Sequence, residues 1–227
     1  MSESRSDAVD VLDRHYAVEL PHSPEEVEAA MRLRYQVFCQ ERRIFPADGR
    51  IETDRYDAWS RHVVLRRRSD RILVGAARLV PWSTLRPTDS MPMQQVCAPA
   101  LLRGTPMESL GEISRFSLSR EWRGEDRGED VLLRLGLMRG LLRVSREIGL
   151  THWCAAMEPS LLRLLRRVSV RFEPVGPLVE YRGLRQPAVA EIDTVLKQGR
   201  TERPALWSYV TQTGLAVAPP SELALAA

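Results

Sequence analysis

The spacing of hydrophobic residues along this chain alternates between the two-residue period of a β-strand and the 3.6-residue period of an α-helix. Strand-like patterns occur at residues 16–20, 62–66, 72–80, 110–119, 151–157 and 206–210, with a pair of short strands broken by Pro and Gly in 172–181. Helical patterns occur at residues 24–41, 126–148, 159–168 and 188–197. This order predicts an α/β fold in which helices cover a mixed central sheet.

Local signals mark the ends of the two longest predicted helices. Ser23 and Glu26 fit a capping box, and Pro24 suits the first position of the helix that follows. The helix 126–148 has acidic residues in its first turns and basic residues near its end, which complements the helix dipole. Gly149 then stands where a C-cap is expected.

The segments between these elements indicate a single domain. Residues 42–59 are predicted to be irregular. The Pro-rich segment 81–106 is longer than an ordinary connection, which is typical of binding loops and mobile lids. We expect residues 14–212 to form one domain, with flexible ends at 1–13 and 213–227.

Three charged residues interrupt faces that are otherwise apolar. Arg34 occupies a core position of its helix, and Arg78 and Glu112 each share a strand face with hydrophobic neighbours. An isolated charge on such a face is costly unless it is paired, so each residue needs a partner or a task. Asp54 and Asp57 are the expected anions for the two arginines. A buried network that holds the loop and a substrate site explain this pattern equally well, and the two are compatible.

Glu112 is the candidate general base. Burial on an apolar strand face would raise the pKa of its carboxyl toward the range useful for accepting a proton, whereas an ion pair with a neighbouring arginine would make it structural. Ser114 is a candidate donor to a reacting carbonyl or a simple backbone contact, and His62 is a weaker candidate for proton transfer. On strand 110–119 the two-residue period places Leu110, Glu112, Ser114, Phe116 and Leu118 on one face, and Ile113, Arg115 and Ser117 on the other.

Composition excludes several classes of protein. The chain has 227 residues, 44% hydrophobic and 28% charged, which is typical of a globular protein, and no run is long enough to cross a bilayer. The first residues lack the pattern of a secretory signal, so we expect a cytoplasmic protein. Cys39, Cys97 and Cys154 have no metal-ligand spacing and are predicted to be reduced packing residues. No phosphate loop, HExxH or GxSxG motif is present, which argues against metal catalysis and serine hydrolase chemistry.

The basic residues are scattered among the acids, although the net charge is +3. A nucleic-acid-binding protein usually gathers its charge on one face, so we expect no nucleic-acid partner. A non-catalytic, arginine-rich module that binds nucleic acid or regulates another protein is the alternative from another class. The two dense clusters are residues 66–68 and the helix positions Arg163, Arg166 and Arg167. Each is either a solvated face or a patch that docks an acidic protein.

Five short motifs follow one another along residues 34–116. They are RYQVFCQE (34–41), ETDRYD (52–57), SRH (60–62), GAARLVP (75–81) and EISRF (112–116). Together they resemble the autoinducer-synthase branch of the GNAT acyltransferases. That branch includes N-acyl-homoserine lactone synthases, N-acyl amino acid synthases and the acyltransferases associated with PEP-CTERM/exosortase systems.

The resemblance implies a GNAT-like fold, with a mostly antiparallel sheet flanked by helices, and the transfer of an acyl group from a thioester on acyl carrier protein to a primary amine. It implies no tightly bound cofactor and no metal. Matched positions suggest that Arg34, Phe38, Asp54 and Asp57 shape the acceptor side, with Phe116 also contacting substrate. Arg78, Glu112 and Arg115 would form a charged network beneath it, and Glu112, Ser114 and Arg115 are the candidate catalytic residues. Backbone N–H groups near residues 117–119 are the simplest donors to an oxyanion.

Departures from the branch guide the choice of substrates. Homoserine-lactone synthases typically have a tryptophan where this chain has Ile44, so the sequence favours an N-acyl amino acid synthase with an amino acid or related metabolite as acceptor. The turn at 119–124 does not form a clean pyrophosphate loop, so acyl carrier protein is preferred to coenzyme A as the acyl donor. The alternatives are an N-acyl-homoserine lactone synthase that uses S-adenosylmethionine and an acyl-CoA-dependent acetyltransferase.

Overall fold

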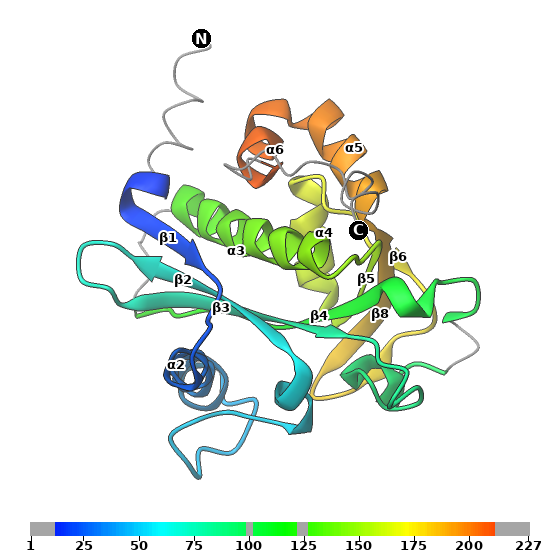
Figure 1. Cartoon of the computed structure of the whole chain (residues 1–227), viewed down its shortest axis with the longest axis horizontal. Helices are drawn as coiled ribbons and strands as arrows, with labels where there is room; N and C mark the ends of the chain where they lie inside the picture. The colour runs from blue at the N-terminus through cyan, green and yellow to red at the C-terminus, as the bar shows by residue number, and fades with distance from the viewer. Residues whose placement is uncertain (1–11, 99–101, 122–126, 212–227) are drawn as a thin grey trace, which may run out of the picture.

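The computed structural model describes residues 12–98, 102–121 and 127–211, and within them eight strands form one sheet (Figure 1). The strands are β1 (Tyr16–Glu19), β2 (Arg61–Arg67), β3 (Leu73–Pro81), β4 (Leu110–Leu118), β5 (His152–Met157), β6 (Glu173–Pro174), β7 (Val179–Glu180) and β8 (Leu184–Glu191). Their order is β1-β2-β3-β4-β5-β8-β6, and β7 also pairs with β8. Only β4 and β5 pair in parallel, so the predicted mixed, mostly antiparallel sheet is confirmed.

Helices cover both faces of this sheet. They are α2 (Pro24–Tyr35), α3 (Arg127–Glu147), α4 (Pro159–Arg167), α5 (Ile192–Glu202) and α6 (Pro204–Thr211). Figure 1 shows α2 on one face and α3 on the other. The larger core lies on the α3 side, whereas α2 packs Ala30 and Leu33 against Val64 and Ala76. None of the described helices is both long and apolar enough to cross a membrane.

The helix ends predicted from capping residues, at the start of α2 and after α3, are confirmed. The capping box of Ser23 and Glu26 is present at the start of α2. Residues 36–41 continue the helix as a π-helical turn, η1 (Gln36–Glu41), so the predicted extent is also correct. Gly149 follows α3 with a φ of +73°, a left-handed conformation that glycine adopts without strain.

Two predicted elements near the C-terminus were wrong. Residues 188–191 belong to β8 and the helix α5 begins only at Ile192, because the small residues Ala188 and Ala190 pack against β5 and hide the two-residue period. Residues 206–210 form a helix, α6, instead of a strand. A Cβ on Gly199 would lie 2.1 Å from the Trp207 ring, so α6 is held by a close contact with α5 that no local pattern reveals.

The face assignment of β4 was correct only as far as Ser114. Arg78 pairs with Ser114 but Ala76 pairs with Ser117, so β4 carries an extra residue, and Arg115 has a φ of +50°. Beyond this bulge the alternation reverses, and Leu118 packs in the α3-side core with Ile113. Pairing between β4 and β5 ends at Glu112 and Cys154, which leaves a wedge between the two strands.

The long segment after β3 has structure of its own. It contains the 3-10 turns η3 (Pro92–Gln95) and η5 (Met107–Ser109) and buries Met91, Met93 and Leu102 against β3, β4 and β5. All three cysteines are free and buried, as predicted. The ends predicted to be flexible lie outside the described residues, apart from Leu12, which is buried in the core, and Asp13.

Candidate functional site

Six charged side chains form an arginine–carboxylate network on the α2 face of the sheet. Arginines and carboxylates alternate in it, and its members are Arg34, Glu52, Asp54, Asp57, Arg78 and Arg115. Three positive and three negative charges balance. Arg34 and Arg78 are completely buried, so only this pairing compensates for the cost of removing them from water.

Arg34 links α2 to the loop that precedes β2. Its Nε donates to Glu52 at 2.7 Å, and its NH1 donates to Asp57 at 2.6 Å. Asp57 also accepts from the backbone N–H of Asp54 at 2.8 Å, and Asp54 caps the 3-10 turn η2 (Arg55–Trp59). These bonds fold residues 52–59 across the sheet, as the sequence predicted for Asp54 and Asp57.

Arg78 and Arg115 complete the network from β3 and β4. Arg78 NH1 lies 2.6 Å from Asp54 and 2.9 Å from Asp57, and its Nε donates to Ser114 at 3.1 Å. Arg115 NH2 lies 2.8 Å from Glu52 and 2.9 Å from Asp54. The β4 bulge therefore turns Arg115 toward the carboxylates. The sequence analysis did not identify Glu52 as a member of the network. Its only sequence signal is its place two residues before Asp54.

The network sets the titration of its acids and of His62. Burial alone would raise the pKa of Asp57, but hydrogen bonds and charge from Arg34 and Arg78 hold that pKa well below its usual range. Burial acts to raise the pKa of Asp54 too, but the hydrogen bonds and charge of Arg78 and the charge of Arg115 lower it. Burial, together with the positive charge of the nearby Arg34, lowers the pKa of His62 to about 4. His62 is therefore a neutral, structural residue near pH 7.

His62 gives a pH-dependent contribution to stability. Its pKa is about 4 in the folded chain and about 6.5 when exposed. The unfolded chain therefore binds a proton first as pH falls, and the free energy of unfolding should drop by up to about 3 kcal/mol between pH 6.5 and 4. Urea unfolding of the chain and of His62→Gln at both pH values measures this. An equal drop in both proteins would contradict it, and His22→Gln, at an exposed site, is the control.

Glu112 lies apart from the network. Its Oε2 accepts the backbone N–H of Met93 at 2.6 Å, and no ion pair to it is present among the described residues. It is buried beside Val80 and Cys154, its partners on the neighbouring strands. Burial raises its pKa to about 7, as expected, although the Met93 N–H and the charges of Arg78 and Arg115 act to lower it. The expected network of Glu112 with Arg78 and Arg115 is present only as this attraction at a distance, without a direct ion pair.

The wedge between β4 and β5 holds a cavity of about 430 Å³. Residues 112–118 of β4 form one wall, η1 contributes Phe38, and α4 contributes Leu161 and Leu165. Apolar lining residues also include Val37, Met138, Leu164 and Phe172. Glu112, Ser114, Arg115 and Phe116 all line it, so the structure brings these predicted site residues to one cavity.

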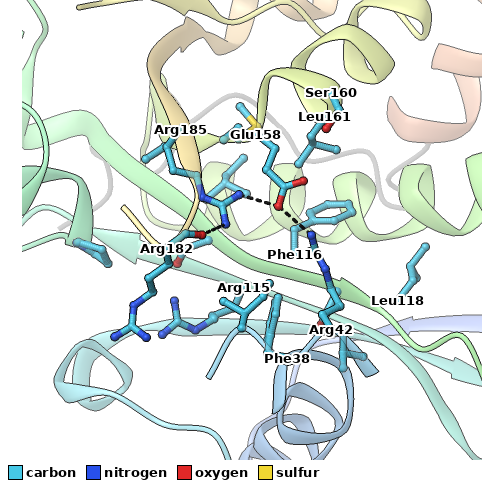
Figure 2. Close-up of a pocket in the computed structure, with 18 of the residues that line it drawn as sticks. Phe38, Arg42, Arg115, Phe116, Leu118, Glu158, Ser160, Leu161, Arg182 and Arg185 are labelled. Carbon is cyan, nitrogen blue, oxygen red and sulfur yellow. Dashed lines mark hydrogen bonds and ion pairs between the residues drawn. The ribbon is translucent and has the colours of Figure 1, made fainter. Parts of the chain in front are cut away.

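An ion triad spans this cavity. Glu158 accepts from Arg42 of the η1 end at 2.7 Å and from Arg185 of β8 at 2.8 Å. Figure 2 shows the two arginines reaching Glu158 from different sides, with Phe116 next to the triad and Phe38 below it. The triad joins the two sides of the wedge, and no pattern in the sequence pointed to it.

A second cavity of about 310 Å³ lies against the acidic loop. Its lining includes Tyr35, Asp48, Glu52 and Asp54, together with Phe45, Arg115 and Arg182. The last three residues also line the first cavity, so the two cavities meet there. Phe45 packs edge-on against Phe38, with ring centroids 5.9 Å apart, which places Phe38 behind this junction.

Oxyanion donors were predicted near residues 117–119. The N–H of Ser119 donates to Val74 at 3.0 Å, so it is not free for a substrate, and Ser117 lies two residues before it, paired with Ala76 of β3. N–H groups alternate in direction along a strand, which turns the N–H of Leu118 toward the wedge. Of the predicted oxyanion donors at residues 117–119, the N–H of Leu118 is therefore the remaining candidate.

Comparisons with known proteins agree with this architecture. A model of the family described as N-acyl amino acid synthase FeeM matches residues 29–193. An acyl-homoserine-lactone synthase of Ralstonia nicotianae (strain ATCC BAA-1114 / GMI1000) is 34% identical over 163 residues, which cover 68% of this chain and 76% of that protein.

Solved structures show the same fold at lower identity. BjaI, a CoA-dependent acyl-homoserine lactone synthase solved with SAM and isopentyl-CoA, has a TM-score of 0.57 at 24% identity, covering 85% of this chain and 84% of that chain. A putative N-acetyltransferase from Lactobacillus plantarum has a TM-score of 0.53 at 17% identity, covering 78% and 99%. The GNAT-like fold and the acyltransferase class predicted from the motifs are confirmed, and the chain belongs to the FeeM N-acyl amino acid synthase family.

Proposed function

We propose that this acyltransferase moves a fatty acyl group from a thioester to the amine of S-adenosylmethionine and forms an N-acyl-homoserine lactone. The observation that carries this proposal is the 34% identity to the Ralstonia acyl-homoserine-lactone synthase over 163 residues. This relative supports lactone synthesis better than the amino-acid acceptor that Ile44 favoured. S-adenosylmethionine therefore replaces the amino acid that the sequence favoured as the acceptor in this proposal.

The acyl chain is assigned to the cavity in the β4–β5 wedge. Its far end is lined by apolar side chains from α3 and α4, such as Met138 and Leu165, and burying a hydrocarbon chain there is favourable. The thioester carbonyl then lies along β4, where the N–H of Leu118 can donate to the oxyanion. The acceptor enters through the second cavity and meets the thioester at the junction beside Phe45.

Glu112 supplies the proton acceptor for this reaction. The neutral amine attacks the thioester carbon, the C–N bond forms and the C–S bond breaks, and the thiol leaves. The amine proton passes to the Glu112 carboxylate, directly or through one water, and then to the leaving thiolate. In the second step the acceptor's carboxylate displaces methylthioadenosine from the carbon next to the sulfonium and closes the lactone.

The donor is assigned to acyl carrier protein. Arg163, Arg166 and Arg167 are exposed on α4, while Leu162 and Leu165 of the same helix face inward. Opposite charge speeds the encounter with an acidic carrier, so a basic surface next to the acyl cavity favours this donor. Acyl-CoA is the competing donor, since BjaI is CoA-dependent.

N-acyl amino acid synthesis is the second candidate function. Two observations favour it: the description of the matching family model, and Ile44 at a position where lactone synthases typically have a tryptophan. The same acyl cavity and the same base would serve it, because only the acceptor differs.

One assay separates these candidates. Purified protein is incubated with acyl carrier protein or coenzyme A thioesters and with S-adenosylmethionine or single amino acids, and products are identified by mass spectrometry. Acyl-homoserine lactone together with methylthioadenosine supports the proposal. Acyl amino acids with no methylthioadenosine overturn it in favour of the second candidate. The preferred thioester identifies the donor.

The wedge cavity should set the acyl chain length. Leu161 is half-buried and lines it from α4, so Leu161→Trp fills space that the chain would occupy. We expect at least about a 10-fold shift in kcat/KM toward shorter chains, consistent with the loss of one or two buried CH₂ contacts. Leu178→Trp, at an exposed leucine away from the cavity lining, is the control. An unchanged chain-length profile in Leu161→Trp would place the acyl chain elsewhere.

A further inference from the structure

We propose that Arg182 binds the carboxylate of the acceptor and so restricts the enzyme to amines that carry an α-carboxylate. The inference rests on the proposed function, and it holds for both acceptor candidates, because S-adenosylmethionine and free amino acids share this group. No motif in the sequence singled out Arg182.

Arg182 is an uncompensated cation at the junction of the two cavities. Its guanidinium carbon lies 4.4 Å from the centroid of the Phe45 ring, and its side chain is exposed. Within the described ranges no carboxylate pairs with it. Arg115 lies 4.8 Å from the same ring, but it is committed to Glu52 and Asp54. The second guanidinium therefore leaves a positive charge free for an incoming anion.

The backbone holds Arg182 in this place. Its φ is +54° and that of Gly183 is +93°, so the turn between β7 and β8 is left-handed at both residues. Arg185 NH2 donates to the Arg182 carbonyl at 2.8 Å, and Arg185 is itself bound to Glu158 (Figure 2). Positive φ at two successive residues is the ordinary geometry of a tight β-hairpin turn, so the hairpin together with the Arg185 contact fixes the backbone at Arg182.

This position suits an amino-acid acceptor. Phe45, Arg115 and Arg182 line both cavities, so a carboxylate bound there is at the boundary between the acceptor and the acyl group. The amine nitrogen of an α-amino acid is only two bonds from its carboxylate carbon. Binding the carboxylate at the junction therefore brings the amine to the thioester. Asp48 is exposed on the same lining, but no ion pair between it and Arg182 is present.

A guanidinium group is well suited to bind the carboxylate of the acceptor at this junction. It presents parallel N–H donors that match the two oxygens of a carboxylate, while its flat face stacks on an aromatic ring. Lysine would keep the charge but lose the paired hydrogen bonds. Arg182→Lys should therefore bind the acceptor more weakly than the wild type and more tightly than Arg182→Gln.

The test measures thiol release with matched acceptor pairs. Each pair is an acceptor and the same molecule without its carboxylate, either S-adenosylmethionine and its decarboxylated form or an amino acid and its amine. For Arg182→Gln we expect KM for the carboxylate form to rise at least about 10-fold, with kcat nearly unchanged, and the preference for it over the decarboxylated form to fall equally. Arg200→Gln, at an exposed arginine of α5, controls for the loss of one charge.

The outcomes separate this inference from the proposed function. If the wild type transfers acyl groups to both members of a pair equally well, the inference fails and the acyl transfer stands. If Arg182→Gln raises KM for the thioester donor instead, the anion that Arg182 binds is a phosphate of the donor, and the inference is overturned. A wild type that acylates neither pair overturns the proposed function. An acceptor-specific rise in KM, partly rescued in Arg182→Lys, supports the assignment.

Discussion

Replacing Glu112 with Gln is expected to lower kcat at least about 100-fold without unfolding the protein. The substitution preserves the shape of the side chain, and the amide oxygen can still accept the Met93 N–H that holds Glu112 at 2.6 Å. It removes a group on the cavity wall whose raised pKa suits it to accept the amine proton. Steady-state kinetics with the thiol-release assay measure the loss.

The pH dependence of the wild type provides a second readout. A pKa of about 7 means that the Glu112 base is ionised above neutral pH, so kcat/KM should rise between pH 6 and 8 with its midpoint near 7. The contribution of Glu112 to stability changes with pH in the opposite direction. The folded chain holds the Glu112 proton up to a higher pH than the unfolded chain does, so this contribution is present at low pH and is lost as pH rises through 7.

Glu112→Gln should therefore lose the rising limb of the pH profile and gain relative stability above pH 7. Glu108→Gln, at an exposed glutamate just before β4, is the matched control and should change neither. Turnover of Glu112→Gln within about 3-fold of the wild type would remove Glu112 from the role of base and leave it structural.

Replacing Arg78 with Met is expected to cost about 3–5 kcal/mol of unfolding free energy. Arg78 is completely buried and pairs with both Asp54 and Asp57. Removing it leaves a net negative charge on a network that is largely buried, and a typical domain has only about 5–15 kcal/mol to lose. Urea unfolding at pH 7 measures the change.

Two further variants test the reason for this loss. Arg78→Met combined with Asp54→Asn restores equal numbers of positive and negative charges and should recover part of the stability. Arg78→Lys keeps the charge but cannot reach Asp54, Asp57 and Ser114 with one planar fork, so it should fall between the wild type and Arg78→Met. Arg61→Gln, at an exposed arginine of β2, is the control. A loss below about 1 kcal/mol in Arg78→Met would show that the network is dispensable for folding.

Arg115 belongs both to the arginine–carboxylate network and to the lining of the two cavities. Its ion pairs with Glu52 and Asp54 hold a left-handed residue at the bulge of β4, which lies beside the wedge where β4 and β5 no longer pair. The same residue lines both cavities. The charges that hold the acidic loop in place therefore also shape the junction at which we propose that acceptor and thioester meet.

The sequence by itself determined the order of the elements from β1 to α4 and identified the two buried arginines of the network. Arg34 and Arg78 were recognisable because a charge on an apolar face breaks a period that local geometry imposes, and Asp54 and Asp57 were the expected partners. Glu112 was recognisable for the same reason. These inferences need only the spacing of residues along one element and the cost of burying a charge.

Tertiary structure alone decided the rest. The bulge at Arg115 reversed the faces of β4, because strand register depends on the partner strand, and the helix α6 exists because Trp207 packs on Gly199. The separation of Glu112 from the arginines and the place of Arg182 over Phe45 depend on segments distant in the chain. Burial and charge pairing between such segments are set by long-range packing, which no local period of hydrophobic residues records.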